Sequence, residues 1–160
     1  MFWDFNPNLI YCVAIKAKVK KMLSKKTQYA LQALSYMVGK KSDTPILIAE
    51  IAQEKNIPLK FLESILLELR KAGSLESKKG KNGGYFFAVP PTQIKLSSIF
   101  RIIEGPIALL PCVSLNFYEK CADCNEKKCG INKVMIEVRD NTLAILDKRT
   151  VADLNFKKEK

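Results

Sequence analysis

The feature that most constrains the fold is a pair of short helical patterns separated by an abrupt break. The first pattern covers residues 48–55, and the second begins near Pro58 and runs to about Ala72. Asn56-Ile57-Pro58 interrupts the chain between them, because proline is unfavourable inside a helix but suits its first turn. Gly73 is a natural C-terminal stop for the second helix. Two helices joined by a tight turn, the first of them short, are typical of a helix-turn-helix.

A hairpin is predicted directly after this unit. Residues 75–78 alternate like a strand, residues 79–84 form a glycine-rich turn, and residues 85–89 form the apolar return strand. Asn82-Gly83 is a strong signal for a tight turn. A hairpin in this position is a wing.

Three further helices are predicted by apolar spacing, over about 24–39, 95–104 and 132–148. The expected fold is therefore mainly α with a small β-hairpin wing: a winged helix-turn-helix plus a long C-terminal dimerisation helix. The apolar surface of the last helix is wider than a small domain needs for itself, which favours a dimer interface. Docking onto the chain's own first helix would use the same residues, so that alternative stays open.

The length of 160 residues indicates one domain, or one domain with an appendage. We expect a winged helix-turn-helix over 22–92, a linker helix and cysteine-rich sensor loop over 93–131, a dimerisation helix over 132–154 and a frayed tail over 155–160. Residues 1–21 form either an upstream extension before a start at Met22 or a docked N-terminal helix, and Cys12 within them is expected to be a lone thiol. No membrane span or signal peptide is expected, and the default location is cytoplasmic.

The net charge of +11 favours a polyanionic partner, of which nucleic acid is the commonest. The lysines cluster before the first strong helix and around the glycine turn. The chain contains no histidine, which excludes histidine-based catalysis, metal ligation and pH switching. It also shows no nucleotide-binding glycine loop and no suggestive pair of carboxylates. We therefore do not expect an enzyme.

Four cysteines follow the spacing C-x8-C-x2-C-x4-C, namely Cys112, Cys121, Cys124 and Cys129. In a chain without a signal peptide, such a cluster indicates a bound metal or a redox switch instead of a disulfide framework. Thiolates ligate both iron–sulfur clusters and structural zinc, and four sulfurs complete either site. Ligand-free thiols acting by oxidation and a merely structural set are the alternatives. Cys112 follows Leu109-Leu110-Pro111 and could instead be a buried core cysteine.

The order helix, helix-turn-helix, glycine wing, cysteine loop and long helix resembles the Rrf-two-type winged-helix regulators, the family that contains IscR, NsrR and CymR. Four stretches carry the resemblance, and together they are highly specific: Leu23-Ser24-Lys25-Lys26-Thr27-Gln28-Tyr29-Ala30, Ile57-Pro58-Leu59-Lys60-Phe61-Leu62-Glu63, Leu69-Arg70-Lys71-Ala72-Gly73 and Lys78-Lys79-Gly80-Lys81-Asn82-Gly83-Gly84-Tyr85. The resemblance covers about residues 22–154. It implies a homodimeric transcriptional regulator that binds a near-palindromic double-stranded DNA operator and senses redox, iron or nitrosative state.

The resemblance also implies the DNA contacts. Lys60 and Glu63 fall near the start of the recognition helix, where side chains reach base edges and a carboxylate can accept a hydrogen bond from a cytosine amino group. Phosphates would be neutralised by Lys25, Lys26, Lys78, Lys79 and Lys81. Two alternatives stay open. Glu63 could instead be a solvated helix residue, and Tyr29 could lie either at a phosphate or in the core. Phe61 and Tyr85 are expected to pack under the wing.

The chain departs from the family pattern at two places. Leu47 stands where a serine or threonine usually caps the second helix, so packing must hold that helix start. Members like IscR carry a histidine ligand three residues after the last cysteine, where this chain has Asn132. A cluster, 2Fe–2S or 4Fe–4S, would then be held by cysteines, and all four are the expected ligands. The competing functions are a metal-free thiol-redox or partner-controlled repressor, a zinc-stabilised regulator, and an interaction module whose helix-turn-helix binds protein.

Overall fold

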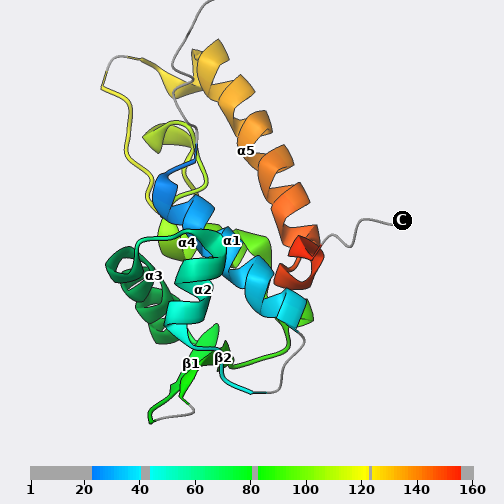
Figure 1. Cartoon of the computed structure of the whole chain (residues 1–160). Coiled ribbons are helices and arrows are strands. Elements are labelled where there is room, and N and C mark those ends of the chain that lie inside the picture. The colour runs from blue at the N-terminus through cyan, green and yellow to red at the C-terminus, as the bar shows by residue number, and fades with distance from the viewer. Residues whose placement is uncertain (1–22, 41–43, 81–82, 123, 156–160) are drawn as a thin grey trace, which may run out of the picture.

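The computed structural model describes residues 23–40, 44–80, 83–122 and 124–155. This part of the chain is mostly helical, with one two-stranded antiparallel hairpin (Figure 1). The helices are α1 (Lys25–Lys40), α2 (Ile48–Lys55), α3 (Leu59–Lys71), α4 (Leu96–Ile103) and α5 (Gly130–Lys148), and the strands are β1 (Leu75–Lys78) and β2 (Gly84–Phe87). The winged helix-turn-helix predicted from the sequence is confirmed. Within the described residues, no helix is both long and apolar enough to cross a membrane.

The core lies where α1, α2 and α3 meet, with α4 and β1 closing it. α1 contributes Leu34 and α2 contributes Ile51, both with no exposed surface. The buried stripe of α3 is the one expected from its spacing, and all four side chains are fully buried: Leu62, Ile65, Leu66 and Leu69. Burial of this stripe leaves the opposite face of α3 open to solvent.

The turn between α2 and α3 follows from the residues that predicted it. Asn56 adopts the left-handed conformation, with φ of 50°, which asparagine tolerates better than most residues. The Ile57 N–H then bonds back to the Ala52 carbonyl at 2.9 Å, and the Pro58 carbonyl accepts the first bond of α3. Leu47 at the start of α2 makes no side-chain cap, as expected, so only backbone bonds and packing secure this helix start.

The wing is the β1–β2 hairpin, paired in the register Leu75↔Phe87 to Lys78↔Gly84. β2 begins at Gly84 and ends at Phe87, somewhat earlier than the expected 85–89. Tyr85 pairs on its other side with Ile46, through two backbone bonds of 2.9 Å. This bridge joins the wing to the segment before α2. The expected tight turn at Asn82 falls outside the described residues.

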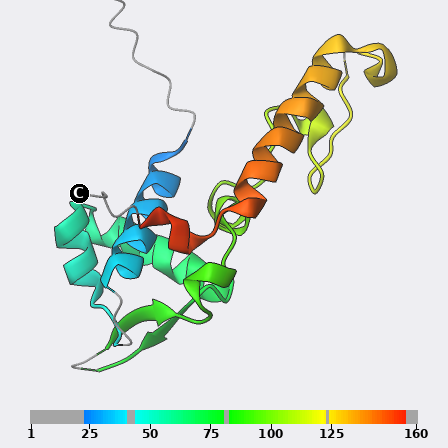
Figure 2. The same ribbon diagram turned by 90° about the vertical axis from the view of Figure 1, so that its right-hand side faces the viewer.

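The segment that follows α5 returns to the body. After α5, a 3-10 turn over Val151–Leu154 packs on α1, with Val151 fully buried. The Ser35 hydroxyl donates to the Leu154 carbonyl at 3.0 Å. α5 itself packs on α4 and on the 3-10 turn Pro111–Val113, and it projects from the body with the cysteine loop at its far end (Figure 2). The sequence predicted a single helix over 132–154. The structure has α5 followed by a separate turn that is docked on α1.

Candidate nucleic-acid interface and cysteine loop

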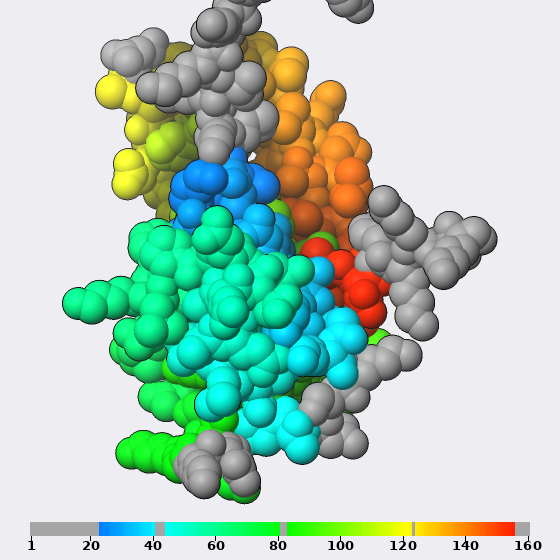
Figure 3. Space-filling view, viewed as in Figure 1, coloured from blue at the N-terminus to red at the C-terminus, as the bar shows by residue number. Residues whose placement is uncertain are grey.

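The solvent-facing side of α3 carries the residues expected to read DNA. Lys60 and Glu63 are exposed in the first two turns of the helix. Leu59 and Phe61 beside them are 44% and 40% exposed, high values for large apolar side chains. Figure 3 shows the surface of α2 and α3 continuing down to the hairpin, so the recognition helix and the wing share one side of the molecule.

Tyr29 of α1 supports this surface. Its ring meets the Phe61 ring edge-to-face, with centroids 5.7 Å apart and an interplanar angle of 84°. The Lys25 ammonium lies 5.7 Å from the Tyr29 centroid. Tyr85 packs against the core under the hairpin, as expected, whereas Phe61 lies against Tyr29 instead.

The expected phosphate-binding lysines have different surroundings. The Lys26 ammonium contacts both carboxylate oxygens of Glu68, at 2.7 and 2.8 Å, which ties α1 to α3. Lys78 and Lys79 are exposed on the wing, where a phosphate can reach them. Lys81 falls outside the described residues. Lys26 can thus reach DNA only by giving up its ion pair, while the wing lysines are already accessible.

The four cysteines of the loop lie along the path between α4 and α5. Cys112 sits in the 3-10 turn Pro111–Val113, Cys121 and Cys124 lie in the loop, and Cys129 caps the N-terminus of α5. All four are half-buried free thiols. The alternative that Cys112 is a buried core cysteine does not hold, because Cys112 is half-buried, whereas its neighbour Val113 is buried.

Hydrogen bonds shift the pKa values of two of these thiols in opposite directions. The pKa of the Cys124 thiol is raised to about 12, chiefly by its hydrogen bonds with Cys121 and Cys129. The pKa of the Cys129 thiol is lowered, chiefly because its sulfur accepts the backbone N–H of Asn132 at 3.4 Å. Cys121, Cys124 and Cys129 therefore form a hydrogen-bonded string, in which the Cys129 thiol ionises more readily than the Cys124 thiol.

Cys112 joins this string through Asn132. The Asn132 side chain is 7% exposed, and its amide nitrogen lies 3.6 Å from the Cys112 sulfur and 3.5 Å from the Cys112 carbonyl. In the sequence, Asn132 stands out only because it occupies the position of a histidine ligand. Its contacts with two cysteines arise because the turn around Cys112 packs on the start of α5, which sequence spacing does not reveal.

The donor set of the loop suits an iron–sulfur cluster or zinc by its chemistry, because thiolates are the preferred ligands of both. The positions of the side chains do not form such a site: within the described residues, no three histidine, cysteine or acidic side chains gather as a group that could hold a metal ion.

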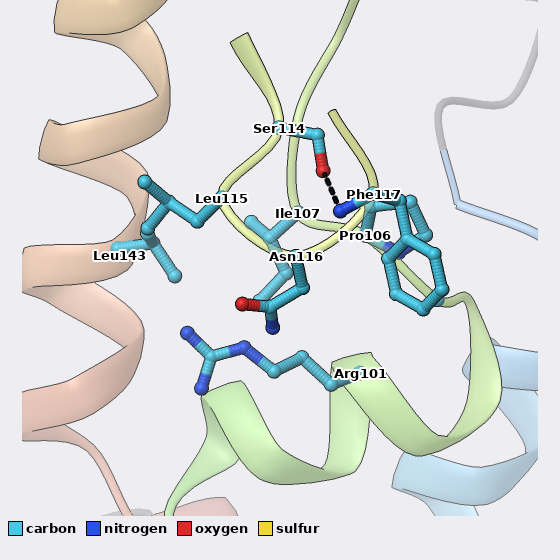
Figure 4. A pocket seen from close by; sticks show the side chains of 9 residues that line it. Arg101, Pro106, Ile107, Ser114, Leu115, Asn116, Phe117 and Leu143 are labelled. Atoms are coloured by element: carbon cyan, nitrogen blue, oxygen red, sulfur yellow. Dashed lines mark hydrogen bonds between the residues drawn. The ribbon is translucent and has the colours of Figure 1, made fainter. Parts of the chain in front are cut away.

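A small cavity of about 40 Å³ lies where α4, α5 and the cysteine loop meet, and sequence reasoning missed it. Arg101 reaches into it from α4 toward Asn116 of the loop, and Leu143 of α5 closes one side (Figure 4). The Ser114 hydroxyl accepts the Phe117 N–H at 3.0 Å and shapes the loop there. This cavity is lined by all three elements that connect the DNA-binding body to the cysteines.

Comparison with known proteins agrees with this geometry. The family model Rrf2, described as iron-dependent transcriptional regulator, matches residues 23–156. An rrf2-like HTH-type transcriptional regulator from Rhodobacter capsulatus is 42% identical over 137 residues, covering 83% of this chain and 91% of the relative.

Solved structures show the same likeness. The structure of CymR, the global cysteine regulator of Bacillus subtilis, superposes with a TM-score of 0.69 at 30% identity, over 84% of this chain and 95% of that one. The IscR of T. potens gives 0.63 at 27% identity, over 84% and 86%. The family model spans the helix-turn-helix, the wing and the cysteine loop, and this chain belongs to the Rrf2 family of transcriptional regulators.

Proposed function

We propose that this chain represses or activates transcription as a homodimer that places α3 in the major groove of an operator and the wing lysines on its backbone. The observation that carries the proposal is the exposed face of α3 with Lys60 and Glu63, together with the exposed Lys78 and Lys79 on the hairpin that packs against α3. Helix side chains in this position read base edges, while lysines fix the register on the phosphates.

The test is DNA binding by charge-removing variants, on operator DNA selected from random fragments with the wild-type protein. Lys79→Ala should weaken binding uniformly across sequences and reduce the salt slope by about 1, the effect of one lost phosphate contact.

Glu63→Gln should relax base preference at one position, by about 1–3 kcal/mol. Lys148→Ala removes an exposed lysine from the last turn of α5 and is the control. Equal affinities and salt slopes in all four proteins would refute this interface.

Dimerisation through α5 is supported by the side of that helix left open to solvent. Ile131, Val134, Val138 and Ile145 recur at spacings of three, four and seven residues, and they are 65%, 52%, 38% and 64% exposed. Such a stripe matches the seam of a helix pair. A second copy of the same helix would cover it.

The cysteine loop is the proposed sensor, and an iron–sulfur cluster is its proposed ligand. Four thiols lie on the segment joining α4 to α5, and lysines around them would offset the negative charge of a thiolate-bound cluster. The family description as iron-dependent regulators supports the same ligand. Gaining or losing a cluster would reorder the loop at the end of α5. In a dimer, that change would alter the spacing of the two recognition helices.

A metal-free thiol sensor is the second candidate, and a specific observation favours it. Cys129 sits at the N-terminus of α5 with a lowered pKa and is hydrogen-bonded to Cys124, so a half-buried thiol that ionises more readily than usual is already in contact with a second thiol. The similarity to CymR, described as a global cysteine regulator, fits this reading as well.

One experiment separates the candidates. The protein is purified anaerobically, and its visible absorbance, iron, sulfide and zinc contents are measured. Iron with equimolar sulfide supports the cluster, zinc alone supports a zinc-stabilised regulator, and a colourless metal-free protein supports the thiol sensor. If cysteine-to-serine variants bind operator identically under oxidising, reducing and metal-free conditions, the loop is not a sensor at all.

A further inference from the structure

Asn132 is the buried polar residue that joins the two ends of the cysteine loop. Its backbone N–H donates to the Cys129 sulfur at 3.4 Å, three residues before it. Its side-chain amide donates to the Cys112 sulfur at 3.6 Å, twenty residues before it. One residue thus contacts a cysteine from each end of the loop.

We propose that Asn132 is the positioning residue of the cysteine site, holding Cys129 through its backbone and Cys112 through its side chain so that both thiols are oriented when the loop binds a metal. This inference rests on the proposed function of the loop as a metal-binding sensor. It assigns a role to the position where relatives like IscR have a histidine and this chain does not.

The contacts around Cys112 explain why its position depends on Asn132. The turn that carries Cys112 is fixed to α5 at two places, where Asn132 meets the Cys112 carbonyl and where the Arg139 guanidinium donates to the Val113 carbonyl at 2.6 Å. Arg139 holds only the backbone of the turn. The Asn132 amide, by contrast, contacts the Cys112 sulfur itself and so orients the side chain of the cysteine.

The two sulfurs depend on different atoms of Asn132, which gives a sharp test. Asn132→Ala removes the side-chain donor to Cys112 and keeps the backbone donor to Cys129. Asn132→Asp keeps the size of the side chain, replaces the amide donor by an acceptor, and serves as the second variant if alanine impairs folding. Asn116→Ala removes an exposed amide from the same loop and is the matched control, because no hydrogen bond among the described residues joins Asn116 to a cysteine.

The first measurement needs no metal. The reduced full-length proteins are treated with iodoacetamide, and alkylation of each cysteine is followed by mass spectrometry. We expect the ratio of Cys112 to Cys129 reactivity to change in both Asn132 variants and to stay at the wild-type value in Asn116→Ala. A merely structural role would alter all the cysteines together, in parallel with a loss of thermal stability.

The second measurement uses cobalt(II) alone, which reports thiolate ligation through its charge-transfer absorbance. Loss of a residue that orients metal ligands typically weakens metal affinity by about 10–100-fold, and we expect about tenfold or more for both Asn132 variants. If the wild type binds cobalt while both variants keep its affinity and its alkylation pattern, the proposal is overturned. If the wild type binds no cobalt or cluster, the metal-sensor function fails, and an unchanged alkylation pattern would still overturn the role of Asn132 separately.

Discussion

Glu104 shows how one side chain fixes two elements of the DNA-binding body. It follows α4, and its carboxylate accepts the Ser24 N–H at 2.8 Å. Ser24 in turn caps α1, since its hydroxyl oxygen accepts the Thr27 N–H at 3.2 Å. Partial burial raises the pKa of Glu104, but hydrogen bonds from Ser24 and Thr27 outweigh that effect, and the net pKa is below its ordinary value of 4.5.

Glu104→Gln is therefore predicted to lower stability in a pH-dependent way. A depressed pKa means that the carboxylate stabilises the folded state above the ordinary value and loses this contribution as the pH falls through the folded-state pKa. Glutamine can still accept the Ser24 N–H but carries no charge. The gap in urea midpoint between wild type and variant should be present at pH 7 and should shrink below about pH 4.5. A gap that stays constant across this range would contradict the ionic role.

At the scale of elements, the start of α2 offers a stabilising change. Leu47 occupies the N-cap position in extended conformation, is 50% exposed and makes no side-chain cap. Leu47→Ser would supply the missing oxygen, and Glu50 already stands at the third helical position, as in a capping box. We expect a gain of about 0.5–1 kcal/mol in the free energy of urea unfolding relative to Leu47→Ala, which lacks both cap and leucine. Equal stability of the two variants would show that packing alone sets this helix start.

The wing depends on a close backbone approach at Gly84. Its φ is +148°, and a Cβ there would lie 2.3 Å from the Ile46 carbonyl oxygen, so Gly84→Ala must push apart the bridge between Ile46 and Tyr85. Gly73 also has positive φ, +76°, but a Cβ there meets nothing within 4 Å. Gly73→Ala should cost only the conformational penalty of about 1–2 kcal/mol. Gly84→Ala should cost more and should also weaken DNA binding through the displaced wing. The prediction fails if the two variants unfold at the same urea concentration and bind DNA equally.

These elements also show what the sequence could reveal. Periodicity and the break at Pro58 predicted α2 and α3 to within a residue, because their buried stripes are local patterns. α5 begins two residues earlier than expected, at Gly130, because the Cys129 sulfur serves as its cap. The docking of Val151–Leu154 on α1 and the contact between Asn132 and Cys112 were missed. Both join residues far apart in the chain, and neither leaves a signal in spacing or composition.

At the scale of the whole molecule, α5 is the helix through which two copies of the chain are proposed to pair. One side of α5 packs on α4, where Ser97 donates to Asp147, and on the turn around Val113. The other side carries the exposed stripe of Ile131, Val134, Val138 and Ile145. An exposed apolar surface of this kind normally marks an interaction site.

Val138→Lys is therefore predicted to dissociate the dimer without unfolding the protomer. Val138 lies at the middle of the stripe, so a lysine there would bury an unpaired charge against the partner helix, whereas in the monomer it remains solvated. We expect the dimer dissociation constant, measured by sedimentation equilibrium, to rise by about tenfold or more, because central apolar residues at interfaces contribute about 2 kcal/mol or more.

Glu137→Lys is the control. It places the same charge on the adjacent exposed position, off the stripe, and should leave the dimer intact. Operator affinity should fall with dimerisation, since one protomer can occupy only one half-site. If both variants remain dimeric with equal affinity, the interface lies elsewhere and α5 only connects the cysteine loop to the body.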